Sequence, residues 1–149
     1  MALETVLVAV GDDDDERVDA LARTAIDIAG PAGATVALLH VFSDDQYARV
    51  KSKLEFGPDD EVTPDAVARR HATIRDLSTT LEEAGIEYSS QGAVGEKGEE
   101  VVGAAEALGV DLVLVGGRKR SPAGKAVFGS TAQEVIMNAP CPVTFVRSE

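Results

Sequence analysis

The sequence predicts an α/β fold in which a parallel sheet of five strands carries helices on both faces. Short apolar runs alternate along the chain with longer segments of helical periodicity, so a helix is expected after every strand except the last. The runs TVLVAV and ATVALLHV are almost entirely aliphatic and β-branched, which is typical of strands buried on both faces. Glycine or proline stands at most boundaries between these segments.

The first third of the chain contains two expected strands and one expected helix. The strand Thr5–Val10 is followed by the acidic run 12–15 and then by a segment whose apolar residues recur at helical spacing. We expect Gly30 and Pro31 to end this helix, because both residues disfavour its continuation. The second strand is expected at residues 34–41.

The remaining elements follow the same alternation after one irregular segment. Residues 43–63 are rich in Asp, Lys, Gly and Pro, and we expect them to contain a short helix or to form a mobile flap. The later elements are a helix from Pro64 to a cap at Gly85, a strand at 86–94, a helix capped near Gly109, a strand at 112–115, a helix at 129–138 and a strand at 142–147.

This alternation fixes where a ligand is expected. Strands joined through helices form a parallel sheet with right-handed crossovers. Ligands bind such sheets beyond the carboxyl ends of the strands, at the point where the strand order reverses. The segments that meet there are the ends of the first, second and fourth strands, residues 10–13, 41–43 and 115–118.

Length and composition exclude several classes of protein. The 149 residues are expected to form one domain, residues 1–149, and no apolar run approaches the ~20 residues that a membrane helix needs. The N-terminus lacks the basic region of a signal peptide, so we expect a cytoplasmic protein that does not bind membranes. The single cysteine, Cys141, excludes an internal disulfide and is expected to pack as a small residue.

The charge balance is strongly acidic, with 14 Lys+Arg against 26 Asp+Glu and a net charge of -12. This balance argues against nucleic-acid binding, which needs cations to displace the counterions of phosphates. Five lysines stand against nine arginines, and aromatic residues make up only 4%. An acidic, lysine-poor surface predicts a halophile protein, because high salt screens its self-repulsion.

The segment 110–131 carries the clearest functional pattern. An apolar strand runs into Gly116 and Gly117, a loop with four cations follows, and Gly129 opens a helix. Glycine lets backbone amides approach phosphate oxygens, and the free amides of a helix start favour an anion. The alternatives are a helix start with a Ser or Thr N-cap and no ligand, and a solvated loop whose cations pair with the surplus carboxylates.

At this point the sequence resembles the universal stress protein family over essentially its whole length. The resemblance rests on VLVAV in the first strand, LLHV in the second, and LVLVGG and GSTAQEVIMNAPCPVTFVR near the end. It implies a doubly wound domain of the adenine nucleotide alpha hydrolase type with strand order 3-2-1-4-5. It also implies a homodimer through the last strand, residues 143–146, whose exposed β-branched edge supplies a physical motive.

The ATP-binding branch of that family has a glycine, two residues, a second glycine, nine residues, and then glycine with serine or threonine. Gly116 fits the first position, and Gly129 with Ser130 fits the last pair. Lys119 stands where the second glycine is expected. At the end of the first strand Gly11 stands where the family usually has an aspartate that contacts the nucleoside, and Asp12 comes one residue later.

The resemblance therefore implies a nucleotide site at the carboxyl edge of the sheet. Adenine and ribose are expected near the end of the first strand and the second strand, and the phosphates near the glycine loop and the start of the last helix. The implied nucleotide-binding residues are Ala9, Val10, Gly11, Asp12, Val41, Val115, Gly116, Lys119, Gly129, Ser130 and Thr131, with Arg118, Arg120 and Lys125 as outer charges.

Other candidate chemistry is weaker. Residues 12–15 are expected to cap a helix, with a Mg²⁺ site that bridges to phosphate as the alternative. His40 and His71 lie far apart in the sequence, and both are expected to be structural rather than metal ligands. No nucleophile–base pair is evident, so no catalytic residue is assigned and only slow hydrolysis of a bound nucleotide is expected.

The leading functional hypothesis is a regulatory protein of the stress response. It binds ATP or another adenine nucleotide, with Mg²⁺ as an optional companion, and an unidentified protein partner recognises the bound conformation. The alternative is a dimeric interaction module that binds no nucleotide, and the unusual residues Gly11 and Lys119 favour it. A phosphotransfer or hydrolytic enzyme is a third possibility.

Overall fold

The computed structural model describes residues 2–117 and 129–147. The strands of its sheet are β1 (Thr5–Val10), β2 (Thr35–Phe42), β3 (Tyr88–Val94), β4 (Leu112–Gly117) and β5 (Val143–Arg147). Its helices are the short 3₁₀ helix η1 (Asp12–Arg17), α1 (Val18–Ala32), α2 (Asp44–Lys53), α3 (Pro64–Arg70), α4 (Ala72–Glu83), α5 (Lys97–Leu108) and α6 (Ser130–Asn138).

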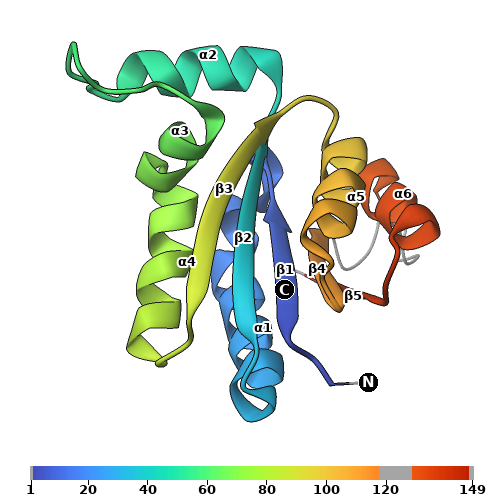
Figure 1. The fold of residues 1–149 in the computed structure, drawn as a ribbon. Helices are drawn as coiled ribbons and strands as arrows, with labels where there is room; N and C mark the ends of the chain where they lie inside the picture. The colour runs from blue at the N-terminus through green and yellow to red at the C-terminus, as the bar shows by residue number, and fades with distance from the viewer. Residues whose placement is uncertain (1, 118–128, 148–149) are drawn as a thin grey trace.

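All described pairs of neighbouring strands are parallel, and the order is β3-β2-β1-β4-β5. The predicted fold class and strand order are therefore confirmed. Helices α1, α3 and α4 cover one face of the sheet, and α5 and α6 cover the other (Figure 1). The order reverses between β1 and β4, so the expected ligand crevice lies at their carboxyl ends.

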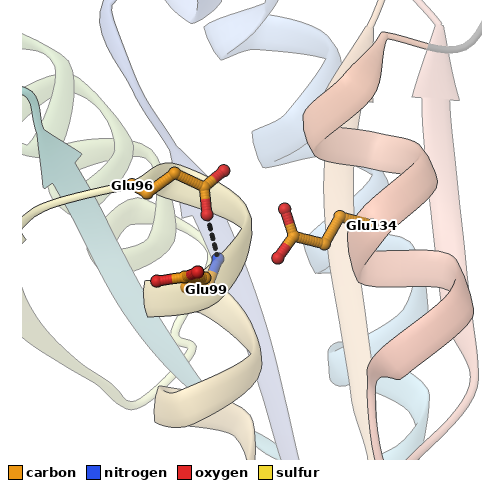
Figure 2. Close-up of side chains that lie close together, drawn as sticks. All are labelled: Glu96, Glu99 and Glu134. Atoms are coloured by element: carbon orange, nitrogen blue, oxygen red, sulfur yellow. Dashed lines mark hydrogen bonds between the residues drawn. The ribbon is translucent and has the colours of Figure 1, made fainter.

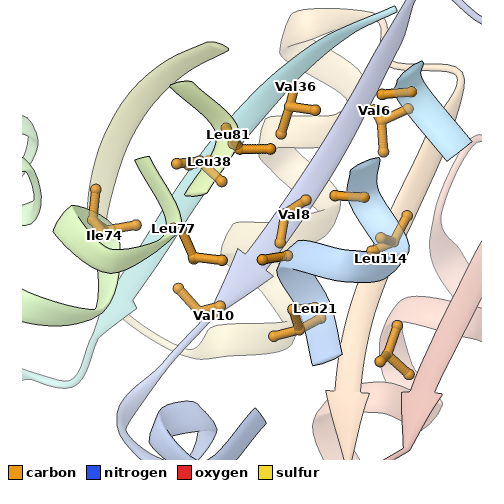
Figure 3. Close-up of a cluster of buried hydrophobic side chains, with 14 of the residues drawn as sticks. Val6, Val8, Val10, Leu21, Val36, Leu38, Ile74, Leu77, Leu81 and Leu114 are labelled. Carbon is orange, nitrogen blue, oxygen red and sulfur yellow. The ribbon is translucent and has the colours of Figure 1, made fainter. Parts of the chain in front are cut away.

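The core has two layers because side chains alternate along each strand. Val6, Val8 and Val10 of β1 point to the layer shared with α1 and α4, where they meet residues such as Leu77 (Figure 3). Leu7, like its neighbours on the opposite face, packs against α5 and α6. Burial on both faces explains why β1 and β2 are apolar without interruption.

The predicted end of the first helix is wrong. Helix α1 continues through Gly30 and Pro31 to Ala32, and Gly33 ends it with a left-handed φ of 67°. Pro31 lies in the last turn of α1, so its missing N–H costs one hydrogen bond near the end of the helix rather than in its middle. A glycine does end the helix, as expected, but it is Gly33, three residues after Gly30.

The helix expected from Pro64 to Gly85 is also wrong, because it is two helices. His71 adopts an extended backbone (φ -74°, ψ 139°), which ends α3 and begins α4. The break lets α3 lie against β3 while α4 packs against α1 (Figure 1). Apolar residues keep helical spacing across the break, so periodicity alone does not reveal it.

The irregular segment 43–63 contains the helix α2, so the expectation of a short helix there is confirmed. Ser43 caps α2, and its hydroxyl accepts the N–H of Gln46 at 3.1 Å. Helix α2 lies beyond the carboxyl end of β2, which places it above the edge of the sheet (Figure 1). None of the described helices has the length and apolar character that crossing a membrane requires.

Candidate functional site

The carboxyl end of β1 is closed by a capping arrangement between Gly11 and Asp14. The Gly11 N–H donates to Asp14 Oδ2 at 2.8 Å, and the Asp14 N–H donates to the Gly11 carbonyl at 3.1 Å. This reciprocal pair explains why a short 3₁₀ helix begins directly after the strand. It also draws the Asp14 carboxylate inward, where its side chain is completely buried.

Two cations neutralise that buried carboxylate. Arg17 donates to Asp14 Oδ1 at 2.6 Å, and the Lys97 ammonium donates to Asp14 Oδ2 at 2.7 Å. Arg17 comes from the end of η1, whereas Lys97 is the first residue of α5. A buried charge is tolerated only when paired, so these three residues form one interdependent cluster. We call Asp14, Arg17 and Lys97 the edge cluster.

The edge cluster lies in the crevice between β1 and β4. A Cβ on Gly11 would stand 3.1 Å from the Lys97 side chain, and a Cβ on Gly116 would stand 2.9 Å from Cδ of Arg17. Gly11 follows β1, and Gly116 lies in the last part of β4. Glycine at these positions therefore leaves room for the two cations at the point where the strand order reverses.

Several of the predicted nucleotide-binding residues offer a ligand mainly their backbone. The side chains of Ala9, Val10, Val41 and Val115 are buried in the two core layers. Gly129 and Ser130 are exposed, and Thr131 is half-buried. Lys119 lies outside the described residues, as do Arg118, Arg120, Lys125 and the side chain of Asp12.

The start of α6 has no side-chain cap. Gly129 is the N-cap residue, and Ser130 is the first helical residue, so the alternative of a Ser or Thr N-cap is wrong here. The backbone amides of a first turn lack partners within their helix. An uncapped helix start that follows the inner strand β4 is an arrangement that favours an anion.

The acidic run after β1 serves structure at the two positions whose side chains are described. Asp14 belongs to the edge cluster, and Asp15 accepts the Thr73 hydroxyl of α4 at 3.1 Å. These contacts agree with the expectation of a capping role for this run. They leave the Mg²⁺ alternative without support from Asp14, whose two oxygens already accept from cations.

His40 and His71, distant in the sequence, lie together in the fold. Their rings meet edge to face at 4.7 Å between centroids, and His40 also stacks on Phe42 at 4.2 Å. His40 is fully buried, and neither of its ring nitrogens has a hydrogen-bond partner. Burial, together with the smaller effects of the charges of His71 and Lys97, lowers the pKa of His40 to about 3. No sequence pattern predicts this contact, which depends on the break between α3 and α4 at His71.

Three carboxylates face one another across the gap between α5 and α6. Glu96 and Glu134 point toward each other, with Glu99 beside Glu96 (Figure 2), and one carboxylate oxygen of each of the three residues lies within 4.8 Å of the other two. Desolvation raises the pKa of Glu134, and the neighbouring Glu96 and Glu99 carboxylates raise it further. Glu96 also caps α5 by accepting the Glu99 N–H. This geometry alone does not define a metal site.

Cys141 agrees with its expected packing role. It is half-buried against the layer formed with α5 and α6. Burial raises the pKa of its thiol, and the nearby Asp111 carboxylate raises it further. A thiol with a raised pKa carries little of the nucleophilic thiolate at neutral pH.

Comparison with known proteins adds the decisive observation, because a model of the universal stress protein family matches residues 3–147. The chain belongs to the universal stress protein family. A curated relative in this family, the universal stress protein of Mycolicibacterium smegmatis, is 31% identical over 84 residues. That match covers 56% of this chain and 65% of the relative, so it spans less than two thirds of the relative's length.

Solved structures from the family have the same fold. A universal stress protein from Archaeoglobus fulgidus matches with a TM-score of 0.67 and 27% identity, covering 97% of this chain and 98% of that one. A universal stress protein in complex with cAMP matches with a TM-score of 0.68 and 21% identity, and both chains are covered completely. A universal stress protein from Archaeoglobus fulgidus in complex with dAMP matches with a TM-score of 0.62 and 22% identity, covering 99% of this chain and 100% of that one.

Family resemblance and spacing pointed to the carboxyl edge of the sheet but did not predict the edge cluster that lies there. Neither Arg17 nor Lys97 belongs to a recognisable motif, and the two residues lie 80 positions apart in the sequence. One signal was present, since Asp14 follows Gly11 at the three-residue spacing of a capping box. That spacing predicts the backbone contact of Asp14 but not its burial between two cations.

Proposed function

We propose that this chain binds an adenine nucleotide at the carboxyl edge of its sheet and that occupancy sets a conformation that partner proteins recognise. The observation that carries the proposal is the uncapped start of α6, which follows β4 beside the point of strand reversal. Family membership supports it, as do the relatives of similar fold that were solved with cAMP and dAMP.

Phosphate and nucleoside would meet different parts of this edge. The amides of the first turn of α6 and the hydroxyl of Ser130 would donate to phosphate oxygens. The backbone near Gly11 and Val41 would face the base and ribose. We propose ATP with Mg²⁺ as the first ligand to test, since a triphosphate gives the helix start and the nearby cations the most charge to bind.

We propose binding rather than turnover as the main role. The Asp14 carboxylate accepts from Arg17 and Lys97, which makes it a poor general base. The imidazole of His40 lies in the core and does not reach solvent. Hydrolysis of ATP by this chain is expected to stay slow.

We further propose that the chain acts in the cytoplasm, as one domain, and as a homodimer through β5. This strand ends the sheet order, so one of its edges has no neighbour within the described part of the sheet. On the adjoining helix α6, Met137 is 76% exposed and Ile136 is 43% exposed. An open strand edge beside apolar side chains suits a two-fold contact with a second copy.

A substitution at Gly129 tests the nucleotide site directly. Gly129 has an extended backbone (φ -64°, ψ 162°) that any residue adopts, and no described atom lies within 4 Å of the position of its Cβ. Gly129→Val should therefore fold normally while its side chain stands where phosphate approaches α6. Calorimetric titration with Mg-ATP should show binding by the original chain and a loss of at least about tenfold in the variant.

Gly103→Ala serves as the matched control, because Gly103 is exposed on α5 with open space around it and lies near the middle of that helix. It should bind Mg-ATP like the original chain. If the original chain binds no nucleotide and releases none on denaturation, the proposal fails and the family's alternative of a dimeric interaction module gains support. Equal binding by Gly129→Val would place the phosphate elsewhere.

A further inference from the structure

A groove runs along the outer edge of the sheet, between α4 and the first half of β3. Strand β3 ends the sheet order, and α4 runs beside it (Figure 1). The groove has a volume of about 610 Å³, and its charged residues are Arg69, Arg75 and Glu82. We call it the β3 groove. Its walls carry the hydroxyl groups of Ser78, Thr79, Tyr88, Ser89 and Ser90.

The backbone of β3 leaves hydrogen-bonding groups unpaired in this groove. The N–H and C=O groups of alternate residues in a parallel strand point to opposite sides. The Glu87 carbonyl accepts an N–H of β2 at 3.0 Å, whereas the Gly92 N–H points away from β2 and donates to Asp65 at 2.8 Å. By the same alternation, Tyr88 and Ser90 direct their N–H and C=O groups away from β2. No hydrogen bond joins these groups to the described part of the chain.

The two arginines of the groove have no counter-ion among the described residues. Arg69 of α3 and Arg75 of α4 are both exposed, and neither forms an ion pair with a described carboxylate. Glu82 accepts the Tyr88 hydroxyl, and Asp65, one turn before Arg69, accepts the N–H from β3. Two such guanidinium groups, in a chain whose net charge is -12, favour a ligand that carries carboxylates.

We propose that the β3 groove binds an extended, acidic segment of a partner protein, which adds to the sheet as a further strand beside β3. The backbone of such a segment pairs with the outward groups of Tyr88 and Ser90. Side chains on one face of the added strand lie toward α4, where Asp or Glu meets Arg69 and Arg75 in the paired geometry of carboxylate and guanidinium. Because α3 already holds the Gly92 N–H, the pairing is confined to the first half of β3.

A second copy of this chain does not suit the same edge. Two-fold pairing of one β3 with another would place the arginines of both copies side by side, and like charges that face each other across two strands are destabilising. The groove is also separate from the nucleotide site, since Ser89 pairs with Ala37 near the amino end of β2. The inference therefore goes beyond the proposed function, and its test needs no nucleotide.

Fluorescence anisotropy measures the binding of two labelled peptides at one KCl concentration. Glutamate alternates with valine in the first peptide, and glutamine replaces each glutamate in the second. The double variant Arg69→Gln with Arg75→Gln removes the charges of the groove. The control, Arg23→Gln with Lys53→Gln, also removes two positive charges, from exposed positions on α1 and α2 that do not line the β3 groove.

The original chain should bind the glutamate peptide at least about fivefold more tightly than the glutamine peptide. The double variant at Arg69 and Arg75 should lose at least about fivefold in affinity for the glutamate peptide, and the control should stay within about twofold of the original chain. The proposal is overturned if the original chain does not bind the glutamate peptide, binds both peptides equally, or loses affinity equally in the two variants.

Hydrogen exchange on the unaltered chain tests the strand pairing and does not depend on how the variants fold. The N–H groups of Tyr88 and Ser90 should exchange at least about tenfold more slowly when the glutamate peptide is bound. The N–H groups of Ser89 and Gln91 point to β2 and should be protected with or without the peptide. Bound peptide with unchanged exchange at Tyr88 and Ser90 would show an ionic contact without strand addition, which contradicts the proposal.

Discussion

The buried imidazole of His40 has no hydrogen-bond partner in the described core. His40 is one of the largest fully buried side chains, and both its ring nitrogens lack hydrogen-bond partners. Phe42 stacks on its face and His71 meets its edge. Its neutral form fits this surrounding, whereas a charged form would have to be desolvated beside the Lys97 ammonium.

This environment predicts an acid-sensitive fold. The pKa of His40 is about 3 in the folded chain and 6.5 in the unfolded chain, so between these values the unfolded chain binds the additional proton. The contribution of His40 to the free energy of unfolding is therefore complete above pH 6.5 and decreases as the pH falls toward 3. Between pH 7 and pH 5 the loss should be roughly 2 kcal/mol.

Urea unfolding of the original chain and of His40→Leu at several pH values measures this loss. Leucine has a volume similar to that of histidine and no ionisable group, so the variant should lose less stability than the original chain as the pH falls. The carboxylates titrate in both proteins and cancel in the comparison. Parallel pH profiles for the two proteins would show that His40 does not carry the effect.

At the scale of elements, the contact between α3 and β3 shows how the fold protects an edge strand. Strand β3 ends the sheet order, and α3 lies against it. The Gly92 N–H donates to the Asp65 carboxylate of α3 at 2.8 Å. This backbone N–H is therefore not available to pair with another strand at the edge of the sheet. A Cβ on Gly92 would stand 2.7 Å from the carbonyl carbon of Pro64.

Gly92→Ala should therefore destabilise the chain by about 1–3 kcal/mol, because backbone rather than a flexible side chain blocks the added methyl group. Gly103→Ala adds the same methyl group where nothing described lies within 4 Å, inside α5. It should raise stability by up to about 1 kcal/mol, since alanine favours helix. Thermal unfolding measures the stability of both variants. If Gly92→Ala were as stable as the original chain, α3 would not pack tightly against β3.

The helices also show which parts of an element a sequence predicts well. Periodicity and capping signals located α5, where Gly109 ends the helix with a φ of 62° as expected. They failed at His71 and at Pro31, where packing against β3 or the position of a residue in the last turn decided the outcome. Local preferences predict that a helix exists better than they predict where tertiary contacts end it.

At the scale of the whole molecule, the dominant feature is charge. The chain carries a net charge of -12 over 149 residues. Beyond the edge cluster, the pair between Arg70 and Asp60 joins exposed side chains at 3.5 Å and is worth little. Self-repulsion among surplus carboxylates therefore opposes folding in dilute buffer, and salt screens it.

The melting temperature should consequently rise by several degrees between dilute buffer and molar KCl. Part of that rise comes from the three carboxylates between α5 and α6, so Glu134→Gln should reduce the salt dependence slightly. Calorimetry measures the melting temperature at several KCl concentrations. Sucrose, an uncharged solute, serves as the control that separates screening of charge repulsion from the stabilisation caused by exclusion of a solute from the protein surface. A melting temperature independent of KCl would contradict the prediction of a halophile protein.

Local sequence patterns were sufficient to predict the α/β class, the strands buried on both faces and the glycine residues at the carboxyl edge of the sheet. Those features follow from local periodicity, backbone preference and spacing, which a chain carries before it folds. Only the tertiary structure brought Lys97 to Asp14 and His71 to His40. The members of these pairs lie 83 and 31 positions apart in the sequence. They meet because the crossovers bring distant segments together, and local conformational preferences do not encode such contacts.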